Sequence, residues 1–175
     1  MASGPAPIRA GILTISDRSY SGEYEDRSGP VIRDLVTQRL DAVVELEAIV
    51  PDERPIIVST LLAWADQAGL DLVFTTGGTG FAPRDVTPEA TRDVIERETP
   101  GLAEAMRAAS LQVTPHAMLS RAVAGIRGHT LIINLPGSPK AVCENLKTIL
   151  PALPHAVELL QGQKGSDQHH HFQDR

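Results

Sequence analysis

Aromatic side chains are scarce in this chain of 175 residues, since phenylalanine, tyrosine and tryptophan together make up 3%. The core must therefore be aliphatic, and few rings are available to stack on nucleic-acid bases. Basic residues are also few, since the chain has 16 Lys and Arg residues against 22 Asp and Glu residues, which gives a net charge of −6. We therefore expect neither nucleic acid nor an anionic membrane as a partner.

Cysteine is almost absent, with Cys143 as the single thiol. An internal disulfide and a thiolate zinc cluster are thereby excluded. No apolar run approaches the ~20 residues that a membrane-spanning helix needs. Residues 1–7 lack the basic flank and apolar stretch of a signal peptide. These absences favour a cytoplasmic protein.

Length and composition predict a single domain. Apolar residues make up 42% of the chain, which is enough to bury a sizeable core. Residues 1–7 are small and proline-rich, and we expect a disordered N-terminus there. Residues 163–175 are polar, and we expect a flexible tail. The folded domain is expected at 8–162.

Strand and helix patterns alternate along this domain. Short apolar runs predict strands at 8–16, 42–50, 71–76, 122–126 and 130–135. Helical patterns lie between and after them, at 30–40, 53–68, from Thr87, at 101–111 and from Pro139. Thr87 and Ser138 are expected to cap the helices that they precede. This alternation predicts an α/β fold, with a mostly parallel sheet, helices on both faces, and ligands at the carboxyl edge of the strands.

A glycine-rich loop follows the strand at 71–76. The segment Thr75 to Gly80 reads TTGGTG and exposes backbone N–H groups that suit a phosphate or a nucleotide. It matches neither the P-loop nor the dinucleotide-binding fingerprint. A tight glycine turn without a ligand is the alternative interpretation.

Two carboxylates follow strands at the same expected edge. Asp85 lies five residues beyond Gly80, just before a helix, and Asp52 lies between a strand and a helix. A carboxylate beside bound phosphate requires a cation between them, and Mg²⁺ commonly uses one or two carboxylates plus phosphate oxygens. Both residues are therefore candidate magnesium ligands. The alternative is that each only caps a turn or a helix.

Further polar segments are candidates for ligand contacts. The segment from Pro136 to Lys140 begins a helix directly after a strand. The N-terminus of that helix either binds an anion or is simply capped by its own residues without a ligand. Ser16-Asp17-Arg18 and the segment from Tyr24 to Pro30 follow the first strand. The segment Ser110 to Arg121 carries hydroxyls and an arginine that could hold a phosphate or a polar heterocycle, although on pattern alone it is a loop.

Taken in order, these motifs resemble the molybdopterin adenylyltransferase family, the MoaB/Mog-type molybdenum-cofactor proteins that include the G domain of gephyrin. The resemblance is carried by TTGGTGFAPRDVTPEAT from Thr75, by LSRAVAGIRGHTLIINLPGSPKAV from Leu119, and by TISDRS and VPDE nearer the start. It covers about Ile8 to Gly162. It implies a three-layer α/β/α fold, a homotrimer, and transfer of AMP from MgATP to molybdopterin with release of pyrophosphate.

The resemblance also implies a role for particular residues. Asp85 and Asp52 correspond to the family's catalytic, metal-binding acidic residues. The resemblance implies that the nucleotide is bound by Thr76, Gly77, Gly78, Thr79, Gly80, Gly137, Ser138 and Pro139. It implies that the pterin is bound by Ser110, Thr114, Ser120 and Arg121. A separate molybdate-inserting enzyme is a further implied partner. Two alternatives remain at this point: a non-catalytic molybdopterin-binding scaffold, and a CinA-like nucleotide pyrophosphatase.

Overall fold

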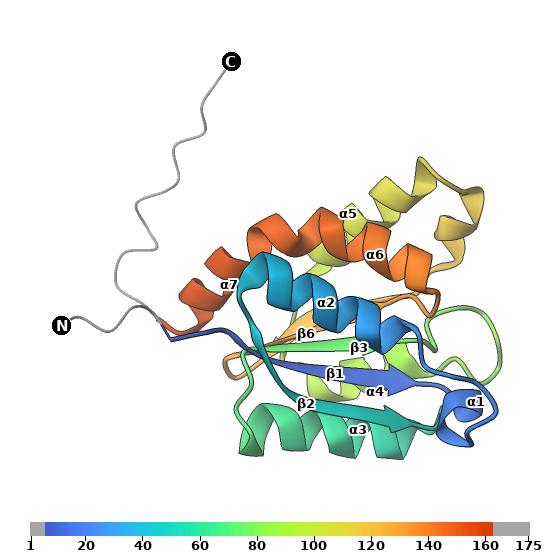
Figure 1. The fold of residues 1–175 in the computed structure, drawn as a ribbon, viewed down its shortest axis with the longest axis horizontal. Helices are drawn as coiled ribbons and strands as arrows, with labels where there is room; N and C mark the ends of the chain where they lie inside the picture. The colour runs from blue at the N-terminus through green and yellow to red at the C-terminus, as the bar shows by residue number, and fades with distance from the viewer. Residues whose placement is uncertain (1–5, 163–175) are drawn as a thin grey trace.

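The computed structural model describes residues 6–162, so the expectations for residues 1–5 and 163–175 lie outside the described residues. This part of the chain forms a six-stranded sheet with the order β2-β1-β3-β6-β5-β4 (Figure 1). The strands are β1 (Arg9–Ile15), β2 (Val43–Val50), β3 (Leu72–Thr76), β4 (Arg97–Glu98), β5 (Ala124–Arg127) and β6 (Thr130–Leu135). Strands β2, β1, β3 and β6 are mutually parallel, whereas β5 pairs antiparallel with both β6 and β4.

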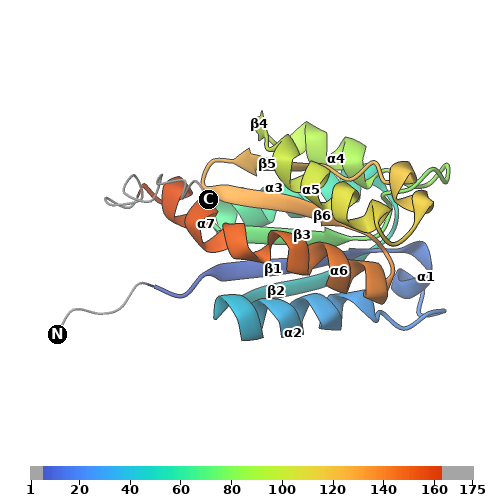
Figure 2. The same ribbon diagram turned by 90° about the horizontal axis from the view of Figure 1, so that it is seen from above.

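Helices cover both faces of the sheet, so the predicted three-layer α/β/α fold is confirmed (Figures 1 and 2). The helices α2, α5, α6 and α7 pack on one face, and α3 and α4 pack on the other. Their bounds are α1 (Asp17–Tyr20), α2 (Ser28–Leu40), α3 (Arg54–Leu62), α4 (Thr87–Val94), α5 (Pro100–Leu111), α6 (Pro139–Ile149) and α7 (Leu153–Leu160). Among the described residues, no helix is both long and apolar enough to cross a bilayer.

The core is aliphatic on both faces, as the composition predicts. On the first face, Ile32 and Val36 of α2 and Leu146 of α6 are fully buried against the sheet. On the second face, Ile57 and Leu61 of α3 are equally buried. Burial of each such side chain stabilises the fold by roughly 1.5–3 kcal/mol before conformational entropy is subtracted. The sheet is thus a firm platform for the loops at its edge.

Helix ends differ from the sequence expectations at a few places. Ser138 caps α6 as predicted, because its hydroxyl accepts a hydrogen bond from the Ala141 N–H at 3.2 Å. Thr87 instead lies inside α4, and its hydroxyl donates to the Gly77 carbonyl at 2.9 Å. The helix expected at 53–68 ends as a π-helical turn, η1 (Ala63–Gln67). The short elements α1, β4 and the 3₁₀ turn η2 (Pro115–Leu119) have no sequence prediction, because so few residues carry no periodicity.

Parallel pairing aligns the strand ends that carry the candidate residues. Ile15 lies opposite Val50, and Thr76 lies opposite both Thr14 and Leu135. The loops after β1, β2, β3 and β6 therefore emerge side by side. Hydrogen bonds continue past the strands, from Ser16 N–H to the Val50 carbonyl at 3.0 Å and from Gly77 N–H to the Leu135 carbonyl at 3.3 Å. This edge is where ligands bind in open α/β sheets.

Candidate active site

The glycine loop packs so tightly that side chains are excluded from it. Gly77 has φ +97°, and a Cβ there would lie 2.2 Å from the Ile15 carbonyl oxygen. Gly78 has φ +64°, and a Cβ there would lie 2.3 Å from the Thr87 hydroxyl. Both the backbone angle and the space require glycine at these two positions. The adjacent Thr76 is buried, and its hydroxyl donates to the Pro136 carbonyl at 2.6 Å.

Asp52 is held by a reciprocal pair of hydrogen bonds with Asp17. The Asp17 N–H donates to Oδ2 of Asp52 at 2.8 Å, and the Asp52 N–H donates to Oδ1 of Asp17 at 3.0 Å. The other oxygen of Asp52, Oδ1, faces Gly78, since it would lie 3.1 Å from a Cβ at that glycine. The loops after β1 and β2 are thereby locked together, with one carboxylate oxygen directed at the glycine loop.

Asp85 approaches the glycine loop from the other side. Its Oδ2 accepts a hydrogen bond from the Ala82 N–H at 2.9 Å. The same oxygen would lie 2.9 Å from a Cβ at Gly80. The two predicted catalytic carboxylates therefore flank the loop, as the sequence interpretation requires, and they repel one another across it.

The surroundings shift the pKa values of Asp52 and Asp17 in opposite directions. Burial raises the pKa of Asp52, and the neighbouring carboxylates of Asp17 and Asp85 raise it further. The backbone hydrogen bond from Asp17 and the charge of Arg84 lower this pKa but do not cancel the rise. Asp17 hydrogen-bonds to the Arg84 guanidinium, which holds the pKa of that carboxyl below its usual value. The ionised form of Asp52 is thus costly to the folded protein without a cation nearby, whereas ionised Asp17 is stabilised.

Arg84 is committed to protein carboxylates. Its Nε donates to Asp17 Oδ2 at 2.5 Å, and its Nη2 donates to Asp17 Oδ1 at 3.0 Å and to Glu53 Oε1 at 2.8 Å. From sequence, Arg84 could equally pair with a phosphate or be solvated. In the structure it ties the loop before α4 to the loops after β1 and β2.

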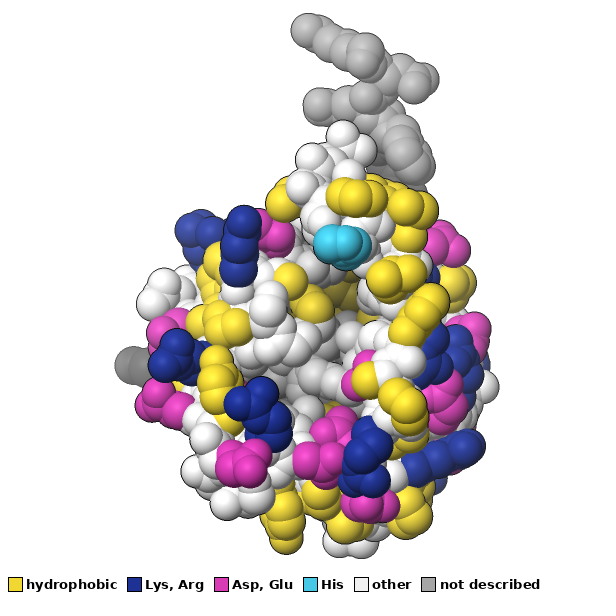
Figure 3. All heavy atoms as spheres, turned by 90° about the vertical axis from the view of Figure 1, so that its right-hand side faces the viewer, with side chains coloured by type: hydrophobic (Ala, Val, Ile, Leu, Met, Phe, Trp, Pro, Cys, Tyr) yellow, Lys and Arg dark blue, Asp and Glu magenta, His cyan; other side chains and the backbone are white. Residues whose placement is uncertain are grey.

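These residues surround a cavity of about 420 Å³, which we call the glycine-loop cavity. It lies at the face onto which the parallel strands open, where Figure 3 shows a hollow edged by acidic and basic side chains. Most of the predicted nucleotide-binding and metal-binding residues line it: Asp52, Thr76, Gly77, Gly78, Asp85, Gly137, Ser138 and Pro139. The structure thus brings together residues from three separate loops, those after β2, β3 and β6.

A second cavity of about 280 Å³, here called the α5–α6 cavity, lies beside the first. It contains three of the four predicted pterin-binding residues, Ser110, Thr114 and Ser120. The remaining predicted nucleotide-binding residues, Thr79 and Gly80, line this cavity rather than the glycine-loop cavity. The glycine run therefore passes from one cavity to the other within Gly78–Gly80, so ligands in the two cavities would meet there.

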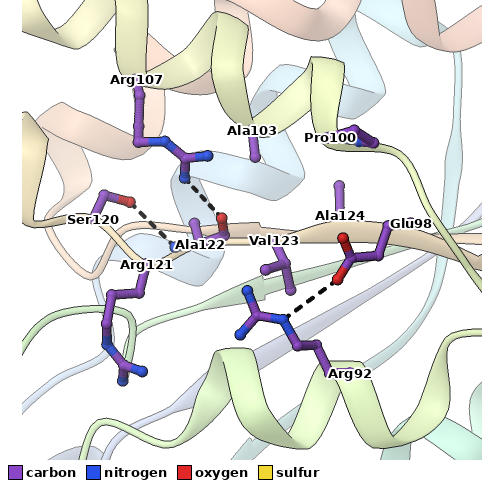
Figure 4. Close-up of a pocket in the computed structure, with 10 residues that line it drawn as sticks. All are labelled: Arg92, Glu98, Pro100, Ala103, Arg107, Ser120, Arg121, Ala122, Val123 and Ala124. Atoms are coloured by element: carbon purple, nitrogen blue, oxygen red, sulfur yellow. Dashed lines mark hydrogen bonds and ion pairs between the residues drawn. The ribbon is translucent and has the colours of Figure 1, made fainter.

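Arg121, the fourth predicted pterin-binding residue, is not among the residues that line the α5–α6 cavity, although its neighbours Ser120 and Ala122 are. It lines a third cavity of about 360 Å³ at the end of β5, the arginine cavity, together with Arg92 and Arg107. Figure 4 shows Arg107 and Arg92 reaching toward this space from α5 and α4, while the Arg121 side chain is turned away from Arg107. The guanidinium of Arg121 is bonded to backbone carbonyls of the glycine-loop region instead.

Several lining residues are absent from the sequence-based site. In the glycine-loop cavity these include Thr14, Ser19, Asp26 and Ser28. Asp26 accepts hydrogen bonds from Thr14 and from the first amides of α2, and Ser28 donates to the Gly137 carbonyl at 2.8 Å. The sequence signal was the polar run after the first strand, which indicated the right edge without singling out residues.

In the α5–α6 cavity the missed residues include Asn145 and Glu144. Asn145 Nδ2 donates to the Ser110 hydroxyl at 3.0 Å, which links α6 to α5 across the cavity wall. Both residues lie within a helix, where their spacing is that of any amphipathic helix. No local motif could have marked them.

The donor chemistry of the glycine-loop cavity fits a magnesium ion. Among residues 6–162, no cluster of three or more His, Cys, Asp or Glu side chains is arranged to hold a metal. Two carboxylates, Asp52 and Asp85, nevertheless line one cavity from opposite sides of a loop made of backbone amides. Mg²⁺ typically takes one or two carboxylates and completes its shell with water and substrate phosphates, and this donor set suits that pattern.

The fold and the two adjoining cavities define an α/β protein that binds its ligands at the strand ends, and comparison with known proteins gives the family. The family model described as "Probable molybdopterin binding domain" matches residues 11–155, and the chain belongs to that family. The molybdopterin adenylyltransferase of Helicobacter pylori strain J99 is 47% identical over 156 residues, which cover 89% of each protein. The resemblance inferred from the motifs is confirmed.

Two further relatives extend this finding. The molybdenum cofactor synthesis protein cinnamon of Drosophila melanogaster is 49% identical over 153 residues, and the chain spans 26% of that longer protein. The crystal structure of the molybdopterin biosynthesis enzyme MoaB from Thermus thermophilus is 53% identical, with a TM-score of 0.84 over 89% of this chain and 98% of that one. A CinA protein of Thermoplasma acidophilum, 19% identical with a TM-score of 0.63, shares the fold alone.

The shift of the Asp52 pKa predicts how stability depends on pH. Because the folded protein raises this pKa above its ordinary value of 3.8, the protonated form favours folding and that contribution is lost as pH rises through the folded-state pKa. Asp52→Asn should therefore raise the melting temperature at pH 7, and the gain should vanish below about pH 4. Thermal unfolding followed by circular dichroism across this range measures the effect.

Asp17→Asn is the matched control for this measurement. The pKa of Asp17 is lowered, so its ionised form stabilises the fold above the ordinary value of 3.8 and this contribution is lost in acid. The substitution should lower the melting temperature at pH 7. A lower melting temperature for Asp52→Asn at neutral pH would contradict the electrostatic account of the site.

Proposed function

We propose that this protein is a molybdopterin adenylyltransferase, which transfers AMP from MgATP to the terminal phosphate of molybdopterin and releases pyrophosphate. The observation that carries the proposal is the pair of adjoining cavities that meet at Gly78–Gly80. One cavity is lined by carboxylates and by the glycine loop, and the other lies between α5 and α6. Family membership and the names of the close relatives support the same activity.

The glycine-loop cavity suits the nucleotide. Its glycines bring backbone N–H groups close to a ligand, and the N-terminus of α6, capped by Ser138, adds a favourable dipole for phosphate. Asp52 and Asp85 would hold Mg²⁺ against the phosphates. When bound, that ion supplies charge neutralisation for the leaving pyrophosphate.

The α5–α6 cavity suits the pterin. Met106 and Ala141 give it apolar walls, and the hydroxyls of Ser110, Thr114 and Ser120 offer hydrogen bonds to the heteroatoms of a polar ring. The ring would lie between α5 and α6, with its phosphate arm directed to Gly80 and Thr79. That arm ends where the nucleotide cavity begins.

The chemistry needs positioning more than it needs a protein nucleophile. An oxygen of the molybdopterin phosphate forms the new bond to the α-phosphorus of ATP, and the bond between that phosphorus and the oxygen bridging to the β-phosphate breaks. The chain's residues orient the two phosphates and hold the charge that develops, which is how phosphoryl-type transfer is generally catalysed. A pyrophosphatase would need a bound water as the attacking group, and a scaffold would bind without reaction.

The direct test is incubation of the protein with molybdopterin, ATP and Mg²⁺, followed by mass spectrometry. Adenylylated molybdopterin and one equivalent of pyrophosphate are expected. AMP formed without the adenylylated product would indicate a pyrophosphatase. Molybdopterin binding with no turnover of ATP would indicate the scaffold. We further propose a cytoplasmic location and delivery of the product to a separate molybdate-inserting enzyme.

Gly78→Ala is expected to abolish ATP binding. The added Cβ would meet the Thr87 hydroxyl at 2.3 Å and Asp52 Oδ1 at 3.1 Å, so it would displace the glycine loop and the Asp52 carboxylate that line the glycine-loop cavity. Gly22→Ala is the matched control, since Gly22 has a similar φ of +78° but open space around it. Both variants carry the same backbone strain. Calorimetric titration with ATP and Mg²⁺ separates them, and equal affinities would argue against a nucleotide at this loop.

Asp85→Asn should abolish adenylyl transfer while the fold and molybdopterin binding persist. Asparagine keeps an oxygen that can accept the Ala82 N–H but removes the negative charge that would hold the metal. Losing one electrostatic contact to a developing charge typically costs about 10²–10³ in kcat. Asp34→Asn, at an exposed position of α2, controls for the change of charge. Wild-type turnover in Asp85→Asn would reduce this residue to a turn former.

The protein is expected to be a homotrimer in solution. The family resemblance motivates this, and apolar side chains such as Val43, Ile49 and Ile56 are available at the surface for burial between copies. Sedimentation equilibrium at micromolar protein should give three times the chain mass of 18.8 kDa. A mass equal to that of one chain would refute the prediction.

A further inference from the structure

Arg121 makes an unusual set of contacts for a residue at the edge of a ligand cavity. Its backbone N–H donates to the Thr79 carbonyl at 2.9 Å. Its side chain donates from Nε to the Gly80 carbonyl at 2.8 Å and from Nη2 to the Asp85 carbonyl at 2.6 Å. The third nitrogen, Nη1, pairs with Glu89 Oε1. The guanidinium is therefore hydrogen-bonded to both ends of the loop that runs from Gly80 to Asp85.

This loop has little else to hold it. Residues 81–84 are all exposed, and Phe81 leaves 68% of its surface in solvent. Inside the loop, the Asp85 N–H donates to the Ala82 carbonyl at 2.9 Å, which shapes the turn but does not attach it to the domain. Without buried apolar side chains, the position of the loop depends on polar attachments.

Glu89 anchors the guanidinium from α4. Its Oε2 is buried and has no hydrogen-bond partner among the described residues, so the carboxylate depends on Arg121 for compensation. Burial works to raise the pKa of Glu89, but the hydrogen bond from Arg121, the backbone hydrogen bond of Glu89 itself and the charges of Arg121 and Arg92 outweigh it, and the net shift is downward. Glu89 is therefore ionised at neutral pH and fixes the orientation of the arginine fork.

On its opposite side the same loop is held by Arg84, which pairs with Asp17 and Glu53. Two arginines thus fix the loop, one toward the loops after β1 and β2 and one toward β5. Figure 4 shows that the Arg121 side chain extends away from Arg107. The arginine cavity and the α5–α6 cavity adjoin, since Arg107, Ser120 and Ala122 line both, but Arg121 lines the arginine cavity alone. Its donors are directed at the protein backbone and not at the pterin slot.

From these contacts we infer that Arg121, held by Glu89, is a positioning residue that fixes the Gly80–Asp85 loop and so sets the place of the Asp85 carboxylate, and that it is not a pterin ligand. The inference rests on the proposed function for the reaction that Asp85 serves. It assigns to Arg121 a role that differs from the one implied by the family resemblance.

The test compares Arg121→Lys with Arg127→Lys. Lysine keeps the positive charge but cannot bond two carbonyls and a carboxylate at once. Arg127, in β5, is a matched control, because its guanidinium likewise pairs with a carboxylate, that of Asp66, and donates to a backbone carbonyl, that of Val94. It lines none of the three cavities. Glu89→Gln removes the anchor of Arg121 without removing the arginine and is the second variant should Arg121→Lys fold poorly.

Arg121→Lys and Glu89→Gln should lower kcat by about 10–100-fold, the usual effect of losing a group that orients a metal-binding residue, and should raise the Mg²⁺ concentration needed for half-maximal rate. The KM for molybdopterin, and its affinity measured without ATP, should stay unchanged. Arg127→Lys should leave all of these values unchanged. A fall in molybdopterin affinity in Arg121→Lys would overturn the inference and restore a direct pterin contact.

Amide hydrogen exchange gives a readout that does not depend on turnover. The amides of residues 82 and 84–86 should exchange faster in Arg121→Lys and in Glu89→Gln than in the wild type or in Arg127→Lys. Unchanged exchange in both variants would overturn the positioning role. If the wild type shows no adenylyl transfer, the proposed function fails, while faster exchange in the two variants still supports Arg121 as the residue that holds the loop.

Discussion

The close packing of the glycine loop against the end of β1 is the constraint on which the rest of the site depends. At Gly77 a side chain would collide with the Ile15 carbonyl, and at Gly78 it would collide with the Thr87 hydroxyl. Because the chain passes there as bare backbone, the loops after β1, β2 and β3 can converge around one cavity. The hydrogen bond from Thr87 to the Gly77 carbonyl then places the start of α4, and with it the approach to Asp85.

This convergence concentrates negative charge, which the fold only partly compensates. Asp52 and Asp85 line the same cavity, and Asp17 lies beside Asp52. Arg84 pairs with Asp17 and Glu53, whereas burial and the neighbouring carboxylates raise the pKa of Asp52. An apo site of this kind is destabilised by its own carboxylates, and a bound divalent cation relieves that repulsion. The cost is tolerable because the sheet beneath is held by two aliphatic cores on opposite faces. Stability is thus supplied away from the residues that carry the chemistry.

Much of this arrangement could be predicted from sequence because it follows from local rules. The apolar runs predicted the longer strands, and Ser138-Pro139 predicted the capped start of α6. Since parallel strands end at one edge, Asp52 and the glycine loop had to lie near one another. The hydrogen-bond partners of Arg84 and Arg121 could not be predicted, because they are 31 to 67 residues away along the chain. Thr87 was wrongly expected to be a helix cap for the same reason, since its hydroxyl bonds to the tertiary neighbour Gly77.

The division of the glycine run between two cavities connects structure to reaction. Thr76, Gly77 and Gly78 face the cavity with the carboxylates, while Thr79 and Gly80 face the slot between α5 and α6. A transfer between two phosphates requires both to approach within bonding distance, and any side chain between them would hold them apart. A short stretch dominated by glycine gives the thinnest wall that a polypeptide can make. For the proposed reaction, the loop after β3 would separate the nucleotide from the pterin and leave their phosphates adjacent at Gly78–Gly80.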